Sequence, residues 1–233
     1  MRHATDRIWS TIANNHQPNI SSHIDHPIRQ AGYPPDQSTD ETNSTRDKPD
    51  YPSLPKPDWL RGYAQLVTDR VSEGWSCYMV TILFSQLPGS RQAILHRMRD
   101  EVARVYSTLV TDVHRKPKNA RPGQLPVLIG AFDLPVYKVD RSNAPPVRCN
   151  GGLHLHTLVL IPPSARLKGS LVDYFQDKQD LYVRLDKPIQ RIHVQPIVDG
   201  HDRVVDYMFK NVLRRRLSYD DALVVLPRSR TEL

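Results

Sequence analysis

Two histidines separated by a single residue are the first groups in this chain that could carry chemistry. His154 and His156 lie in an apolar run that includes Leu155 and Leu158, which is typical of a buried strand. Side chains two positions apart on a strand leave the same face of a sheet, so both imidazoles point the same way. The pair predicts half of a metal site, and a pair of structural histidines is the alternative interpretation.

A third ligand is expected in the preceding apolar segment. Asp133 lies inside the run VLIGAFDLPV, where a carboxylate is costly unless it is paired or binds a metal. If the segment 140–150 closes a hairpin about its centre, Asp133 falls roughly opposite His156. Two imidazoles and one carboxylate suit a divalent cation that keeps open positions, Mg²⁺ or Mn²⁺, with Zn²⁺ as a further candidate. The alternative interpretation is an aspartate that caps the bend at Pro135.

A tyrosine and a lysine near the C-terminus form a second candidate pair. Tyr207 and Lys210 lie in HDRVVDYMFKNVLRRR, whose apolar stripe predicts a helix over 202–216. Residues three apart are neighbours on a helix, where the cation favours a phenolate and can hold a phosphate oxygen. The tyrosine is therefore a candidate nucleophile. An amphipathic tyrosine beside a surface lysine is the alternative interpretation.

Positive charge is concentrated in the part of the chain that holds these candidates. Residues 1–57 contain six Lys and Arg against seven Asp and Glu, whereas residues 58–233 contain 26 against 18. A basic folded part favours a polyanionic partner, most often nucleic acid, although a solvated basic surface gives the same count. Arg214, Arg215 and Arg216 end the predicted helix, where they suit contacts with a DNA backbone or form an ordinary solvated helix end.

The order of the predicted elements indicates how these residues are positioned. Hydrophobic patterning predicts strands at 77–86, 125–137, 152–161 and 191–197, and helices at 58–74, 90–114, about 167–175 and 202–216. With the first helix set aside, this order is typical of an α+β split βαβ fold, a ferredoxin-like or RRM-like antiparallel sheet with helices on one face. In that topology the strands 77–86 and 152–161 are central, and 125–137 is the hairpin partner of the second.

Composition sets the domain boundaries and excludes several classes of protein. Residues 1–57 hold eight of the 20 prolines and no periodic pattern, so we expect a disordered, polar N-terminal tail. A folded domain is expected over 58–217 and a C-terminal tail over 218–233. No apolar run approaches the ~18 residues of a membrane span, and two cysteines indicate a reducing compartment. Membrane, disulfide-rich secreted and collagen-like proteins are excluded.

Three motifs in this order resemble those of the HUH endonuclease superfamily, specifically the rolling-circle replication initiators of bacterial plasmids and phages. YMVTILF (78–84) is similar to the family's first motif, GLHLHTLV (152–159) to its His-hydrophobe-His motif, and VDYMFK (205–210) to its catalytic-tyrosine motif. The resemblance covers about residues 75–216. Asn211 stands where a subclass of the family has a second tyrosine, so the resemblance is to the single-tyrosine type.

The resemblance implies a metal-dependent enzyme that nicks and rejoins DNA at a specific site. His154 and His156, with Asp133 by position, would hold Mg²⁺ or Mn²⁺, and Tyr207 would form a 5′-phosphotyrosine link. Lys210 would orient the phosphate or ease deprotonation of Tyr207. Single-stranded or melted origin DNA is the implied substrate in the cytoplasm of a bacterial host. The chain contains no Gly-x-x-x-x-Gly-Lys-Ser/Thr motif, so we expect host helicase and polymerase as partners.

Two alternatives remain open at the level of sequence. A transposase or mobilisation relaxase of the same superfamily would use the same catalytic residues. A non-catalytic nucleic-acid-binding module on an RRM-like sheet would leave the histidines structural. RNA-binding sheets carry paired aromatics on their central strands, whereas the corresponding strands here carry Tyr78, Phe84 and two histidines, and the Lys/Arg-Gly-Phe/Tyr signature is missing.

Overall fold

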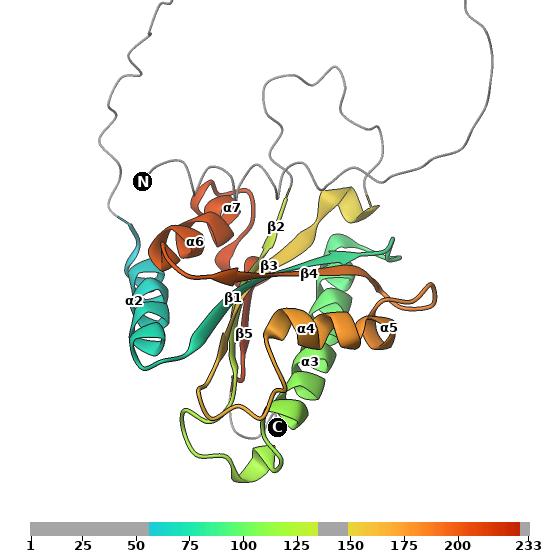
Figure 1. Ribbon diagram of the computed structural model, residues 1–233. Coiled ribbons are helices and arrows are strands. Elements are labelled where there is room, and N and C mark those ends of the chain that lie inside the picture. The colour runs from blue at the N-terminus through green and yellow to red at the C-terminus, as the bar shows by residue number, and fades with distance from the viewer. Residues whose placement is uncertain (1–55, 135–148, 229–233) are drawn as a thin grey trace, which may run out of the picture. The chain divides into compact units, whose positions relative to one another are not determined.

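Five antiparallel strands form one sheet in the order β4–β1–β3–β2–β5 (Figure 1). This computed structural model describes residues 56–134 and 149–228 of the chain. The strands are β1 (Ser76–Phe84), β2 (Val127–Asp133), β3 (His154–Ile161), β4 (Ile189–Ile197) and β5 (Leu223–Leu226). The central position of β1 and β3, with β2 beside β3, is confirmed, as is the α+β class with an antiparallel sheet.

The central strands consist of aliphatic and β-branched residues that are buried on both faces of the sheet. Every residue of β3 is buried, which explains why its sequence reads as a nearly continuous apolar run rather than an alternating one. Phe132 and Leu155 are buried on one face, and Ile129 and Leu158 are buried on the other. A sheet covered on both sides excludes water from polar groups that its central strands carry.

The register of three neighbouring strands brings the candidate ligands onto one face. Asp133 pairs with His154, and Ala131 pairs with His156, in the β2–β3 hairpin. Thr81 of β1 pairs with His156 from the other side. Because directly paired residues project to the same side of a sheet, these polar side chains converge at one point. The sequence patterns predict that Asp133 lies opposite His156. It lies instead opposite His154, which is two residues away on β3 and on the same face.

Two helices cover the opposite face of the sheet. Helix α3 (Arg91–Val113) begins after Ser90, whose hydroxyl accepts a hydrogen bond from a backbone N–H of the first turn. The Arg99 guanidinium lies over the Phe132 ring, at 5.6 Å from its centroid, which fixes α3 on this face. Helix α4 (Leu171–Asp177) packs on the same side, against β4 (Figure 1). These are the two helices that the split βαβ pattern predicts.

Three further helices cover the face that holds the candidate ligands. They are α2 (Asp58–Ser72), α6 (His201–Met208) and α7 (Lys210–Leu213), and Figure 1 shows them together on one side of the sheet. The helix predicted over 202–216 is divided, because the helical hydrogen-bond pattern breaks at Phe209. The sequence patterns predict helices on one face of the sheet. The structure has these helices and a second helical layer, which buries the face that holds the candidate ligands.

The remaining helical elements are short. They are the helices α5 (Gln179–Tyr182) and α8 (Tyr219–Ala222) and the 3₁₀ turns η1 (Pro117–Asn119) and η2 (Cys149–Gly152). Residues 219–226, expected within a C-terminal tail, instead form α8 and the edge strand β5, which pairs with β2. The tail expected over 1–57 lies outside the described residues except for its last two positions. Among the described helices, none has the length and apolarity that crossing a membrane requires.

Gly130 provides a test of the close contact between β2 and β3. A Cβ at this position would lie 2.7 Å from Thr157 Cβ and 2.9 Å from the His156 carbonyl oxygen, so the strands would have to shift. We expect Gly130→Ala to lower the free energy of unfolding by about 1–3 kcal/mol. The matched control is Gly62→Ala in the exposed part of α2, where nothing lies within 4 Å. That change should stabilise the protein by up to about 1 kcal/mol.

The two variants are compared by urea denaturation under identical conditions. A Gly130→Ala protein as stable as the unchanged protein would contradict the close packing of β2 on β3.

Candidate metal centre

Asp133, His154 and His156 form a buried group of potential metal ligands at one end of the β2–β3 hairpin. The Nε2 atoms of the two histidines are 3.0 Å apart. Asp133 Oδ2 lies 3.4 Å from His156 Nε2 and 3.7 Å from His154 Nε2. The exposed fraction is 1% for Asp133, 9% for His154 and 2% for His156. One carboxylate oxygen and two imidazole nitrogens therefore converge in a site that is largely shielded from water.

Each histidine is held by a second contact that turns its Nε2 atom toward the centre. His154 Nδ1 lies 2.8 Å from the Gly152 carbonyl oxygen, and His156 Nδ1 lies 3.0 Å from Thr81 Oγ1. A carbonyl oxygen only accepts, so His154 donates through Nδ1 and keeps a lone pair on Nε2. Metal-binding histidines in proteins are oriented in this way by carbonyl, hydroxyl or carboxylate partners. The arrangement fits a divalent cation.

A turn with three positive φ angles places the Gly152 carbonyl. Asn150, Gly151 and Gly152 have φ values of 54°, 66° and 81°, a conformation that favours glycine and asparagine. The Asn150 side chain accepts a hydrogen bond from the Leu87 backbone N–H and donates one to the Ser85 carbonyl. The turn that leads into β3 is thereby attached to the segment that leaves β1, which holds His154 in position.

The charge of Asp133 is compensated by groups from two directions. Its Oδ1 atom accepts hydrogen bonds from the Asn211 side-chain amide and the Leu134 backbone N–H, and its Oδ2 atom accepts one from Lys210. Burial acts to raise the pKa of this carboxyl, but the hydrogen bond with His156 and the electrostatic interactions with His156, Lys210 and His154 outweigh it. The pKa is held well below its usual range, so Asp133 is an anion at neutral pH.

His154 is neutral at physiological pH, which is the form that binds metals. Burial, followed by the neighbouring His156, lowers the pKa of His154 to about 3, and the attraction of Asp133 only partly opposes this. Metal ligation requires an unprotonated imidazole nitrogen. His154 therefore needs no proton to leave before it can bind a cation at neutral pH.

The structure brings the candidate nucleophile and its lysine to this group from the C-terminal helices. The ring centroid of Tyr207 in α6 is 5.4 Å from that of His156. The Nζ atom of Lys210, at the start of α7, lies 3.8 Å from the centroid of the Tyr207 ring. The five residues predicted to carry the chemistry thus occupy one site, although they come from β2, β3, α6 and α7.

The contacts of Lys210 differ from those that the helical spacing suggests. Its ammonium group binds Asp133 and lies over the face of the Tyr207 ring. Burial, and then the charge of Asp133, raise the pKa of the Tyr207 phenol. The helical spacing thus predicts the contact of Lys210 with Tyr207 but not its ion pair with Asp133.

Asn211 is a site residue that the sequence patterns do not reveal. It is buried, and its amide nitrogen also donates to the Leu134 carbonyl at 2.8 Å. Its Oδ1 atom accepts a hydrogen bond from Arg216 Nη1 at 3.1 Å. The amide is oriented from both ends, and it orients the Asp133 carboxylate in turn. The available signal was a single amide residue between the apolar residues Phe209 and Val212.

The three arginines at the end of α7 are exposed but differ in their surroundings. Burial lowers the pKa of Lys210, Asp133 opposes this, and the positive charges of Arg214 and Arg216 add to the lowering. Arg216 also contacts Asn211, which connects it to the metal-ligand network. Arg215 has a positive φ of 55° where the chain turns back toward α8. Two of the three arginines predicted to contact DNA thus interact electrostatically with Lys210.

Strand β4 adds polar side chains to the same face. Thr81 pairs with His193, and Met79 pairs with Gln195, so both β4 residues project toward the side of the sheet that carries the metal ligands. His193 and Gln195 are partly exposed, unlike Met79 and Thr81 beside them. The buried site therefore adjoins a half-open polar strand at the edge of the sheet, which the sequence patterns do not reveal.

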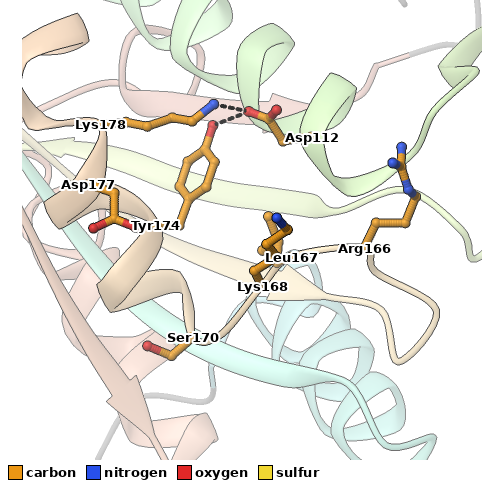
Figure 2. Close-up of a pocket in the computed structure, with 8 residues that line it drawn as sticks. All are labelled: Asp112, Arg166, Leu167, Lys168, Ser170, Tyr174, Asp177 and Lys178. Carbon is orange, nitrogen blue, oxygen red and sulfur yellow. Dashed lines mark hydrogen bonds and ion pairs between the residues drawn. The ribbon is translucent and has the colours of Figure 1, made fainter.

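A separate pocket of about 290 Å³ lies on the side of the sheet covered by α3 and α4. Figure 2 shows Lys178 and Tyr174 of the α4 region both reaching the carboxylate of Asp112 at the end of α3. Arg166 and Lys168 line the same pocket. No predicted site residue lines this pocket, so it is distinct from the metal centre.

The hydroxyl of Thr81 allows a test of how His156 is held. We expect Thr81→Val to weaken Mn²⁺ binding by about 10- to 100-fold, because His156 loses the partner that orients its ring. Thr81→Ser retains a hydroxyl and should bind Mn²⁺ nearly as the unchanged protein does. Isothermal titration calorimetry with Mn²⁺ measures both.

The control for this test is Thr157→Val. Thr157 is also a fully buried threonine, but its hydroxyl donates to the Ile129 carbonyl on the other face of β3. Its substitution should leave the affinity for Mn²⁺ unchanged. Equal losses in the Thr81 and Thr157 variants would show that the hydroxyl of Thr81 has no special part in the site.

No family model matches the chain, and neither a curated protein nor a solved structure matches it. The inference of a function therefore starts from the side chains that the fold brings together. These are an Asp-His-His group that suits a divalent cation, a tyrosine and a lysine beside it, and a basic helix end.

Proposed function

We propose that this protein is a metal-dependent enzyme that nicks and rejoins single-stranded DNA through Tyr207, as in the initiation of rolling-circle replication. The observation that carries the proposal is the position of Tyr207, whose ring lies 5.4 Å from that of His156. A tyrosine, a lysine and three metal ligands from four elements meet at one point. The three sequence motifs supply the class of reaction, and the geometry supports it.

Asp133, His154 and His156 would hold the cation, Mg²⁺ or Mn²⁺. A divalent cation bound there would polarise a non-bridging oxygen of the scissile phosphate and stabilise the charge that develops on it. Tyr207 would attack the phosphorus, forming an O–P bond as the bond from phosphorus to the 3′ oxygen breaks. The phenol proton is lost and the 3′ oxygen gains one, so a 3′-hydroxyl is released. Attack of a 3′-hydroxyl on the phosphotyrosine reverses the step and joins the strand.

Control of the phenol proton follows from the electrostatics around Tyr207. Burial and the anionic Asp133 raise its pKa, so Tyr207 is a neutral phenol at physiological pH. A neutral phenol is a weak nucleophile, which protects the protein and its DNA from unwanted reaction. A divalent cation bound to the Asp133 carboxylate would weaken the second of these two causes and so lower the pKa of the Tyr207 phenol.

The basic end of α7 supports DNA as the substrate. The charges of Arg214 and Arg216 act on Lys210, whose Nζ atom lies 3.8 Å from the centroid of the Tyr207 ring. Such a group suits the phosphates on either side of a scissile bond. We propose single-stranded or melted origin DNA as the substrate, with strand separation and extension of the free 3′-hydroxyl supplied by the host helicase and polymerase.

The nucleophile is tested by substituting Tyr207. With Mn²⁺ and single-stranded DNA that carries the origin, the unchanged protein should form a covalent adduct that survives a denaturing gel. Tyr207→Phe should abolish the adduct, because the phenolic oxygen forms the bond to phosphorus. The control is Tyr78→Phe, since Tyr78 lies on β1 and pairs with Val159, on the face opposite the metal ligands. An adduct that persists in the Tyr207 variant would show that another residue is the nucleophile.

The arginines are tested through the salt dependence of DNA binding. Neutralising one phosphate contact lowers the slope of log K against log salt concentration by about 0.7 for single-stranded DNA. We expect Arg214→Gln to lower the slope by this amount. Arg104→Gln is the control, because Arg104 lies on α3 and pairs with Glu101 on the other side of the sheet. Equal slopes for the two variants, measured by fluorescence anisotropy, would place the DNA elsewhere.

A further inference from the structure

Lys210 contacts the atom of Asp133 that is best placed to bind a metal. The Oδ2 atom of Asp133 faces both histidines, at 3.4 Å and 3.7 Å from their Nε2 atoms. The ammonium group of Lys210 binds this same oxygen, whereas the Oδ1 atom is occupied by Asn211 and the Leu134 N–H. The lysine therefore binds where the carboxylate would donate to a cation.

Lys210 compensates a charge that is otherwise buried. A buried carboxylate needs a cationic partner, and the exposed fraction of Asp133 is 1%. Lys210 is the cation that meets this need, with only 17% of its side chain exposed. A divalent cation at the histidines would place a second, stronger positive charge on the same oxygen. The two cations repel, and the flexible lysine stem can move whereas the strand-borne ligands cannot.

We propose that Lys210 is a counter-ion of Asp133 that competes with a divalent cation for the Oδ2 atom, and that metal binding releases the lysine to bind a phosphodiester of the substrate. This inference rests on the proposed function, since it assigns the lysine's second partner. It makes Lys210 a positioning residue that couples two binding events. Metal and phosphodiester should then each strengthen the binding of the other, and the coupling should require this lysine.

The surroundings of Lys210 favour an anion as its next partner. Its Nζ atom already lies 3.8 Å from the centroid of the Tyr207 ring, so a small movement keeps it beside the nucleophile. Arg214 and Arg216 lie nearby and disfavour a further uncompensated positive charge at this point. A phosphate entering between these side chains compensates all three. The released lysine would thus bind next to the phosphorus that Tyr207 attacks.

Mn²⁺ affinity measures the competition directly. Purified full-length protein is titrated with Mn²⁺ and the free ion is followed by electron paramagnetic resonance, with and without dimethyl phosphate as a minimal phosphodiester. Without the phosphodiester, Lys210→Met should bind Mn²⁺ on the order of tenfold more tightly than the unchanged protein. Dimethyl phosphate should tighten Mn²⁺ binding by about fivefold or more in the unchanged protein and should have little effect in the variant.

A matched control removes the same charge from an ion pair elsewhere. Lys178→Met disrupts the pair with Asp112, at 2.6 Å, on the other side of the sheet (Figure 2). Mn²⁺ affinity should be unchanged in that variant. Lys210→Gln keeps a donor for Asp133 without the charge, and it provides a second test because Lys210→Met leaves a buried anion uncompensated. The rise in melting temperature on adding Mn²⁺ should be larger in both Lys210 variants than in the unchanged protein.

The outcomes separate this inference from the proposed function. Unchanged or weaker Mn²⁺ binding in both Lys210 variants would overturn the inference even if the DNA adduct forms. Tighter binding in the variants, with loss of the coupling but no adduct in the unchanged protein, would support the counter-ion role and refute nicking through Tyr207. Absence of Mn²⁺ binding in every variant would overturn both.

Discussion

The buried carboxylate of Asp133 is the constraint on which the rest of the site depends. An uncompensated charge with an exposed fraction of 1% would cost several kcal/mol, even after relaxation of its surroundings. The compensating groups come from elsewhere in the chain, from β3 and from α7. The C-terminal helices must therefore pack on the sheet for Asp133 to remain charged there. Folding of this layer and assembly of the site are one event.

The packing of α2 explains how the C-terminal helices are held over the sheet. Phe209, at the break between α6 and α7, is fully buried. It stacks on Tyr63 at 5.6 Å between ring centroids and meets Trp59 edge-on at 5.1 Å. Aromatic contacts of this kind bury large areas and fix ring orientations. Phe209 lies between Tyr207 and Lys210 in the sequence. Helix α2, which is outside the three motifs, therefore helps to position both residues by packing against Phe209.

The strand-borne part of the site could be predicted from the sequence. The alternation of side chains along a strand puts His154 and His156 on one face, and the hairpin puts Asp133 beside them. The predicted register differs from the observed one by two residues. Because side chains alternate with a period of two residues, Asp133 stays on the same face. The strand order of the centre follows from the same patterns and the split βαβ topology.

The helix-borne part could not be predicted at that level. Residue spacing places Tyr207 and Lys210 as neighbours, but it does not reveal the break at Phe209 that turns Lys210 and Asn211 toward Asp133. That direction depends on packing between distant segments. Strand β5 escaped prediction for a related reason, since a strand of four residues has too little pattern of its own and is defined by its pairing with β2.

The burial of both faces also bears on the alternative of an RRM-like binding module, because such a module needs an open sheet surface on which bases stack. Here the equivalent central face carries Met79, His156 and Leu158, all buried. In the part of the chain that the structure describes, this face therefore offers no open surface on which bases could stack.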